Sequence, residues 1–487
     1  MERSFYEKDS PPPSPKRKDR KIRMNNPTLK KALWLSIVVL ANIFTGYAQS
    51  SGPNAGGPQS PSKPLLQPIQ VYNAAPAPAA TPFVKKTSIV TNSSSPYTAE
   101  MVVPGYSGIL VETLDGKTVS DSSSTSTFNP ASNVKVATAY AVLKAFGPDF
   151  RFATDVWTDG AIDKVTGTLT GNLYVSGRDP MFNPEHAVAL ALELNKLGIS
   201  SISGDLVVTD NFSLGYSSSA VRSGQSLFAM MDASKRSPAA TRAWQNYLSY
   251  SGRFSQVQGI VPSVSFTGAA YVQAIPGNLR LLFRHESAPM REILKVTLCY
   301  SNNFLAERLG DMLGGAYAVA RSVQLNAGVA PEEFYLQTSS GLGINRVTPH
   351  AMMKLLRALR ADLARYRMTF ADIMPVAGID KGTLENRFDT DFAVGSVVGK
   401  TGTLGNTDGG VSALCGEINT RNGRLLFVIF NQRGGVQKFR AFQNNFVAAI
   451  QGQFGGAAPM AYSPVALETR LAKTRVSYPD SRMRMND

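Results

Sequence analysis

One short stretch of the chain places a nucleophile next to a candidate base. Ser132 and Lys135 stand in a segment that begins after Asn129-Pro130 and continues as a short apolar helix, which Gly147-Pro148 ends. Residues three apart share a helix face, so the hydroxyl and the amine are expected side by side. A serine can then act as a nucleophile if burial or a second cation lowers the lysine's pKa. Alone the spacing is a weak signal, because Ser-x-x-Lys also occurs by chance, with the serine opening a helix and the lysine in solvent.

Two further polar motifs stand far downstream. Ser301-x-Asn303 lies where one expected helix, beginning near Met290, passes into a second helix. Lys400-Thr401-Gly402 lies on an expected strand of a C-terminal meander. Each has a purely structural alternative: Asn303 as a helix cap, and Lys400 as an edge-strand charge that discourages aggregation.

Composition describes a globular protein and excludes several classes. Of the 487 residues, 43% are hydrophobic and 17% charged, which suits more than one folded domain. The formal net charge is +15, but no aromatic-interleaved basic patch or nucleic-acid motif is present, so no nucleic-acid partner is expected. Two cysteines in apolar surroundings, Cys299 and Cys415, are expected to be free buried thiols, with one disulfide as the alternative. A zinc peptidase or Ser-His-Asp hydrolase lacks its parts, and no metal or cofactor is expected, because the three histidines are scattered: His186, His285 and His350.

The N-terminus has the pattern of an export signal. Residues 1–48 begin with a basic, polar segment and continue with an apolar run over residues 32–44, followed by Gly46-Tyr47-Ala48. The run is shorter than the ~20 residues of a membrane-spanning helix, which favours a cleaved signal; Met24 would be a start of more usual length. The alternative is an uncleaved signal that tethers the protein to the inner membrane. Either way we expect a protein of the periplasm or extracytoplasmic envelope.

The composition and hydrophobic periodicity of the remaining chain predict its domain organisation. Residues 49–98 are rich in Pro, Ser and Ala and are predicted to be a linker. Residues 99–150 and 281–455 carry the three motifs and are predicted to form one catalytic domain. Residues 151–280 change to short strands, one helix and a Ser-rich stretch without sustained period, which indicates an inserted region with its own small fold. Residues 456–487 are predicted to be a flexible tail.

Together, the order and spacing of the three motifs resemble the motif set of serine β-lactamases and penicillin-binding proteins. More closely, the chain resembles the D-alanyl-D-alanine carboxypeptidase/endopeptidase family, the class C low-molecular-mass penicillin-binding proteins. Further stretches over roughly residues 100–455 carry this resemblance: Gly171-Asn172-Leu173-Tyr174, Asp179-Pro180, His285-x-Ser287-x-Pro289, Ser340-Gly341-Leu342, Asn345-Arg346-Val347-Thr348-Pro349, Pro375-Val376-Ala377-Gly378, Gly382-Thr383-Leu384 and Lys400-Thr401-Gly402-Thr403-Leu404.

The resemblance implies an α/β (α+β) fold of the serine β-lactamase/DD-peptidase type, with a long inserted β-rich region. It implies a serine-type D-Ala-D-Ala carboxypeptidase or endopeptidase that cleaves peptidoglycan stem peptides through an acyl-enzyme and is acylated by penicillins. Backbone N–H groups of Ser132 and Thr403 would form the oxyanion hole. The implied catalytic residues are Ser132, Lys135, Ser301, Asn303 and Lys400, and the implied substrate-binding residues are Thr401, Gly402, Thr403 and Asp179.

Some positions depart from the family's pattern and leave alternatives open. Ser301-Asn302-Asn303 stands where relatives have Ser-Asp-Asn, and an arginine expected near Ile344 is missing, which bears on recognition of an acidic substrate side chain. Asp179 could face the substrate, or it could only cap its own turn. A β-lactamase or esterase on the same fold, and a catalytically silent wall-binding homologue, are the alternative functions.

Overall fold

A computed structural model describes residues 85–88, 100–257 and 259–479 of the chain. The predicted signal, residues 1–48, lies outside the described residues. A strand, β1 (Lys85–Ser88), falls within the range predicted as a linker and pairs with β2 (Glu100–Val103). No helix in the described part of the chain has the length and apolar character needed to cross a membrane.

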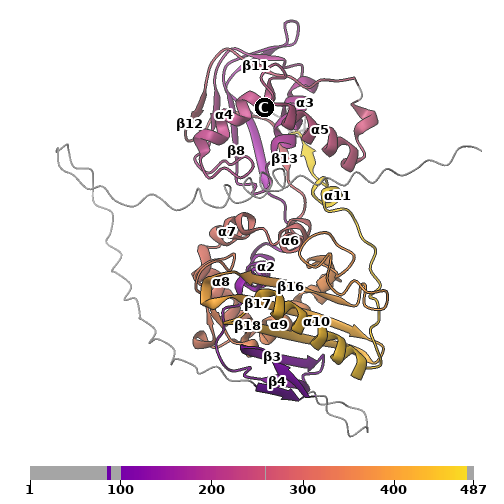
Figure 1. The fold of residues 1–487 in the computed structure, drawn as a ribbon. Coiled ribbons are helices and arrows are strands. Elements are labelled where there is room, and N and C mark those ends of the chain that lie inside the picture. Colours follow the sequence, from indigo (N-terminus) through magenta and orange to yellow (C-terminus); the bar gives the residue numbers. More distant parts are fainter. Residues whose placement is uncertain (1–84, 89–99, 258, 480–487) are drawn as a thin grey trace, which may run out of the picture. The chain divides into compact units, whose positions relative to one another are not determined.

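A five-stranded antiparallel sheet carries the third motif. Its order is β16-β17-β18-β3-β4, so that strands from both ends of the catalytic segments lie next to each other (Figure 1). The predicted C-terminal meander is confirmed, because its three strands pair in sequence order. The strands are β3 (Tyr106–Thr113), β4 (Thr118–Ser122), β16 (Val397–Leu404), β17 (Val411–Thr420) and β18 (Gly423–Gln432).

Helices cover both faces of this sheet. Side chains alternate along a strand, so Leu414 packs with α10 (Val436–Gln453) on one face and Cys415 packs into the core on the other. Figure 1 shows α10 lying along β17. The opposite face is covered by α2 (Val134–Phe146), α6 (Met290–Cys299), α8 (Gly315–Ala327) and α9 (Pro349–Arg365). A separate two-stranded antiparallel sheet is formed by β14 (Phe334–Tyr335) and β15 (Arg346–Val347).

The inserted region has its own sheets and core, and it is larger than predicted. Its six-stranded sheet has the order β12-β10-β8-β5-β13-β19, and β13 (Arg280–Glu286) extends past residue 280, where we expected the insertion to end. The other strands are β5 (Ala153–Thr158), β8 (Leu173–Gly177), β10 (Leu206–Val208), β12 (Ala270–Val272) and β19 (Arg475–Ser477). A second, four-stranded sheet contains β6 (Ala161–Asp163), β7 (Thr168–Thr170), β9 (Ser201–Ile202) and β11 (Ser265–Phe266).

Three α-helices occur in the described part of the inserted region. α3 (Pro184–Lys196) is the one helix that the sequence predicts in this region. α4 (Ala220–Met231) and α5 (Pro238–Ser251) lie in the Ser-rich stretch that had no clear sequence signal. Both begin at a serine cap, Ser219 and Ser237, whose side chain accepts a backbone N–H of the first turn. The serines that obscured the pattern are therefore the start signals of these helices.

The prediction of a flexible tail after residue 455 is wrong for the described residues. α11 (Leu467–Leu471) packs on α6, and β19 pairs with β13. Arg470 and Lys473 both form ion pairs with the buried Glu292, at 2.8 and 2.6 Å. The C-terminal segment thus supplies the counter-charge of a buried carboxylate, and its polar sequence reflects that role.

Candidate active site

Ser132 lies in a tight turn. Two glycines in other segments allow those segments to pack closely against it. The predicted helix begins as a 3-10 turn, Ala131–Asn133, which continues directly into α2. A Cβ atom on Gly341 would lie 1.9 Å from the Ala131 carbonyl oxygen, and one on Gly402 would lie 2.6 Å from the Pro130 carbonyl oxygen. The backbone of the Gly341 loop and that of β16 can therefore pack directly against the turn that carries Ser132.

The backbone is strained next to Ser132 and at Ser301. Ala131 has φ +46° and Ser301 has φ +54°, a left-handed conformation that costs a non-glycine residue about 1–3 kcal/mol. The free energy of the surrounding packing offsets that cost. Ala131 directly precedes Ser132 of the first motif and Ser301 opens the second, so two of the strained positions lie at the site.

Lys135 is the centre of the polar network. Its Nζ lies 3.0 Å from Ser132 Oγ and donates to Asn303 Oδ1 at 2.7 Å and to the Ser340 carbonyl oxygen at 2.6 Å. The side chain is 1% exposed, and burial lowers its pKa to about 7, although the charge of Glu307 raises it. A neutral amine has two N–H bonds and one lone pair. Asn303 and Ser340 accept both N–H bonds, which leaves the lone pair for the Ser132 hydroxyl proton.

Lys400 forms a second buried pair with the other motif serine. Its Nζ donates to Ser301 Oγ at 2.9 Å and to the Thr401 carbonyl oxygen at 2.7 Å. Burial and the nearby charge of Lys135 hold the pKa of Lys400 well below its ordinary value. Because the side chain is fully buried, Lys400 is not the solvated edge-strand charge of the structural alternative.

The helix α7 (Asn303–Asp311) joins the second motif to the rest of the site. Asn302 is its cap, since its side chain accepts the Leu305 N–H, and this leaves Asn303 free to contact Lys135. One turn further on, the Glu307 carboxylate accepts the backbone N–H groups of Ser339 and Ser340 at 3.1 and 3.0 Å. Glu307 thereby fixes the carbonyl that Lys135 uses, a role the sequence reading missed although Glu307 is four residues from Asn303 on the same helix face.

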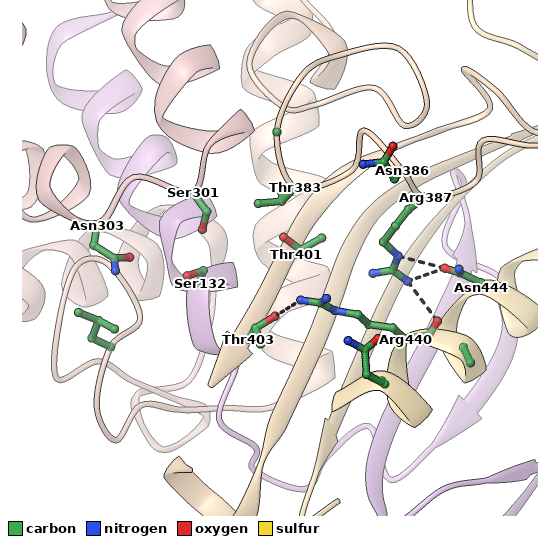
Figure 2. Close-up of a pocket in the computed structure, with 14 residues that line it drawn as sticks. Ser132, Ser301, Asn303, Thr383, Asn386, Arg387, Thr401, Thr403, Arg440 and Asn444 are labelled. Carbon is green, nitrogen blue, oxygen red and sulfur yellow. Dashed lines mark hydrogen bonds between the residues drawn. The ribbon is translucent and has the colours of Figure 1, made fainter. Parts of the chain in front are cut away.

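The two motif serines open onto a cavity of about 730 Å³, shown in Figure 2. Ser132, Ser301 and Asn303 lie at one end of it, and Thr401 and Thr403 line its wall along β16. Sequence reasoning gave no role to its other polar lining residues, of which only Thr383 lies in a stretch that carries the family resemblance: Thr383, Asn386, Arg387, Gln437, Arg440 and Asn444. The buried Cys299 and Cys415 are free, as expected.

Asp179 is not brought together with the other predicted site residues. It is 2% exposed and is not among the residues that line the Ser132 cavity. Its Oδ1 accepts the Met181 backbone N–H at 2.8 Å, which is the contact of a carboxylate that caps its own turn. Burial raises the pKa of this carboxyl to about 6. No group of three or more His, Cys, Asp or Glu residues suited to a metal ion occurs among the described residues.

Comparison with known families decides the class of the protein. The model of the D-Ala-D-Ala carboxypeptidase 3 (S13) family matches residues 101–220 and 231–450. The chain belongs to this family. It is thus a serine-type peptidase of the D-Ala-D-Ala carboxypeptidase class, and the predicted family, fold class and reaction class are confirmed.

Individual relatives of this S13 peptidase are distant but match over most of their length. A D-alanyl-D-alanine carboxypeptidase of Actinomadura sp. (strain R39) is 25% identical over 76% of this chain and 85% of the relative. The penicillin G-acylated predatory endopeptidase Bd3459 of Bdellovibrio bacteriovorus has a TM-score of 0.62 at 23% identity, covering 74% of this chain and 96% of that one. Penicillin-binding protein 4 of Haemophilus influenzae has a TM-score of 0.53 at 20% identity, covering 71% and 96%.

The electrostatics of Lys135 predict how acylation depends on pH. If neutral Lys135 is the base, the rate of acylation by a penicillin rises with pH as the amine loses its proton, with a midpoint near the pKa of about 7. Glu307→Gln removes the charge that raises this pKa, so we expect the midpoint to move to lower pH. The measurement is the second-order acylation rate constant between about pH 5 and about pH 9.

Glu332→Gln provides the matched control, because Glu332 is an exposed carboxylate outside the network. This variant should keep the wild-type midpoint. A folded Glu307→Gln protein with an unshifted midpoint, or one shifted upward, contradicts the assignment of Lys135 as the titrating group.

Proposed function

We propose that Ser132 is the nucleophile of a D-Ala-D-Ala peptidase reaction on peptidoglycan stem peptides, and that Lys135 is its base. The observation that supports this most is the contact set of Lys135: both N–H bonds of the neutral amine have acceptors, and Ser132 Oγ lies 3.0 Å away. A serine hydroxyl is a weak nucleophile until a base removes its proton. In this arrangement the lone pair of Lys135 is available only to that proton.

Acylation forms one bond and breaks another. Ser132 Oγ attacks the carbonyl carbon of the penultimate D-Ala while its proton passes to Lys135 Nζ. Backbone N–H groups of Ser132 and Thr403 stabilise the negative oxygen that develops. The amide bond then breaks as the proton held by Lys135 passes to the departing amine through Ser301, which Lys400 contacts at 2.9 Å, so Lys135 is neutral again. The product is a Ser132 ester and a free D-Ala.

In deacylation, water is the nucleophile and Ser132 is the leaving group. A water molecule loses a proton to Lys135 and attacks the ester carbon, and the Ser132 oxygen leaves and is reprotonated. The sum of the two half-reactions is hydrolysis of one amide bond. Thr401 and Thr403 line the side of the cleft on which the C-terminal carboxylate of the substrate would bind, where their hydroxyls can donate to it, and the buried Lys400 lies directly before them on β16.

Penicillins should follow the first half of this sequence and stop there. Their β-lactam carbonyl takes the place of the scissile amide, and the ring-opened product remains on Ser132. The acylated Bdellovibrio relative is an example of such a complex in that protein. A β-lactamase, the alternative on the same fold, would differ by rapid hydrolysis of the ester.

Ser132→Ala and Lys135→Ala should each abolish labelling by a fluorescent penicillin. Nucleophile and base act as one unit, so each loss should be several powers of ten in the acylation rate, and the double variant should be little worse than either. Ser60→Ala and Lys63→Ala are matched controls, because these residues have the same spacing in the Pro-rich segment. Normal labelling of folded Ser132→Ala would disprove the proposal. Labelling by Lys135→Ala alone would move the base role to Lys400 or Ser301.

We also propose that the mature protein acts outside the cytoplasmic membrane, beginning near Gln49. The family's peptidoglycan substrate and the short apolar run over residues 32–44 support this proposal. Mass spectrometry of the exported protein should find a mature N-terminus after Ala48. Peptides that contain residues 33–44 in the mature protein would instead indicate an uncleaved membrane anchor.

A further inference from the structure

The cavity beside Ser132 continues past Thr403 into a wall made by α10. Gln437, Arg440, Ala441 and Asn444 line it, and their spacing of three, four and seven residues places them on one face of that helix. Arg387 lines the cavity from the loop that precedes β16. Figure 2 shows the Arg440 side chain next to Thr403, with Arg387 and Asn444 on the same side of the cleft.

Neither guanidinium has an anionic partner within the described part of the chain. Arg440 Nη2 donates to Thr403 Oγ1 at 3.1 Å. Arg387 donates to neutral oxygens: Asn444 Oδ1 at 2.6 Å from Nη2, Gln443 Oε1 at 3.2 Å and the Arg440 carbonyl at 3.4 Å. Asn444 Oδ1 also accepts from Arg387 Nε at 3.0 Å. These contacts hold the guanidinium of Arg387 in place and leave both charges without a counter-ion.

The charge of this wall is therefore unbalanced. Arg387 is 9% exposed, and burial together with the charge of Arg440 lowers its pKa to about 10. None of the residues lining the cavity is acidic. Two neighbouring cations at a partly desolvated wall gain most from an anion that both can contact, and a planar guanidinium suits a carboxylate.

We propose that Arg440 and Arg387 form a carboxylate subsite for the leaving group, which favours substrates whose departing residue carries a second acidic group. This inference rests on the proposed function, in which Thr401 and Thr403 bind the α-carboxylate of the departing residue. Arg440 contacts Thr403, so its guanidinium lies next to that carboxylate and beyond it. A departing D-Ala has no second carboxylate that could contact the Arg440 guanidinium. A departing acidic residue, or a peptide that carries further carboxylates, has such a group.

Synthetic peptides that differ only in the departing residue test this subsite. The full-length protein is given N-acylated peptides that end in D-Ala-D-Glu or in the neutral isostere D-Ala-D-Gln, and kcat/KM is measured for each. We expect the wild-type protein to prefer D-Glu by roughly tenfold, the order expected for one charge-assisted hydrogen bond. Arg440→Gln should bring the ratio of the two kcat/KM values close to one, and Arg440→Lys should keep part of the preference.

Lys438→Gln is the matched control, because it removes the same charge from the same helix at an exposed position outside the cavity lining. This variant should keep the wild-type ratio. A wild-type ratio near one, a ratio unchanged in Arg440→Gln, or an equal fall in Lys438→Gln would each overturn the subsite. Penicillin labelling of the wild-type protein separates the two claims: absent labelling means the proposed function has failed, whereas normal labelling with a ratio near one overturns only the subsite.

Discussion

Burial of the Lys135 amine is the constraint on which the rest of the site depends. An ammonium group loses its hydration when it is 1% exposed, and the fall of its pKa to about 7 corresponds to roughly 5 kcal/mol against the charged form. That free energy turns an ordinary cation into a base at neutral pH. It also demands acceptors for the remaining N–H bonds, which Asn303 and the Ser340 carbonyl provide. Burial and the charge of Lys135 also lower the pKa of the second buried amine, Lys400.

The helix α7 connects these acceptors to the inserted region. Asn303 at its start contacts Lys135, and Glu307 one turn later holds the loop that presents the Ser340 carbonyl. The next residue, Arg308, donates to Ser213 Oγ at 2.7 Å and to the Ser217 carbonyl, both in the inserted region. Its guanidinium also lies 3.9 Å from the centre of the Phe304 ring. The inserted region therefore contacts the helix that contacts Lys135 through Asn303, one residue from Glu307.

Sequence predicted the parts of the site that depend on local spacing. Ser132 and Lys135 are three residues apart on a continuous helical path, and the helix junction at Ser301 and the strand at Lys400 follow from periodicity. Contacts between distant segments left no such signal. Nothing in the sequence around Arg387 or Arg440 indicates that these residues, 53 positions apart, lie on one wall of the cleft. The C-terminal segment was misjudged for a related reason, since its charges pair with a buried carboxylate on α6, which a composition-based reading cannot detect.

The protonation state of Lys135 can be measured directly in the free enzyme. Lysines labelled with ¹³C at the ε position would be followed by NMR across the pH range, with the Lys135 signal assigned by its loss in Lys135→Arg. We predict that this one signal titrates near pH 7, far below the ~10.4 of an ordinary lysine. A Lys135 signal that titrates at or above the ordinary value would mean that the amine is charged at neutral pH. That result would contradict its role as the base that activates Ser132.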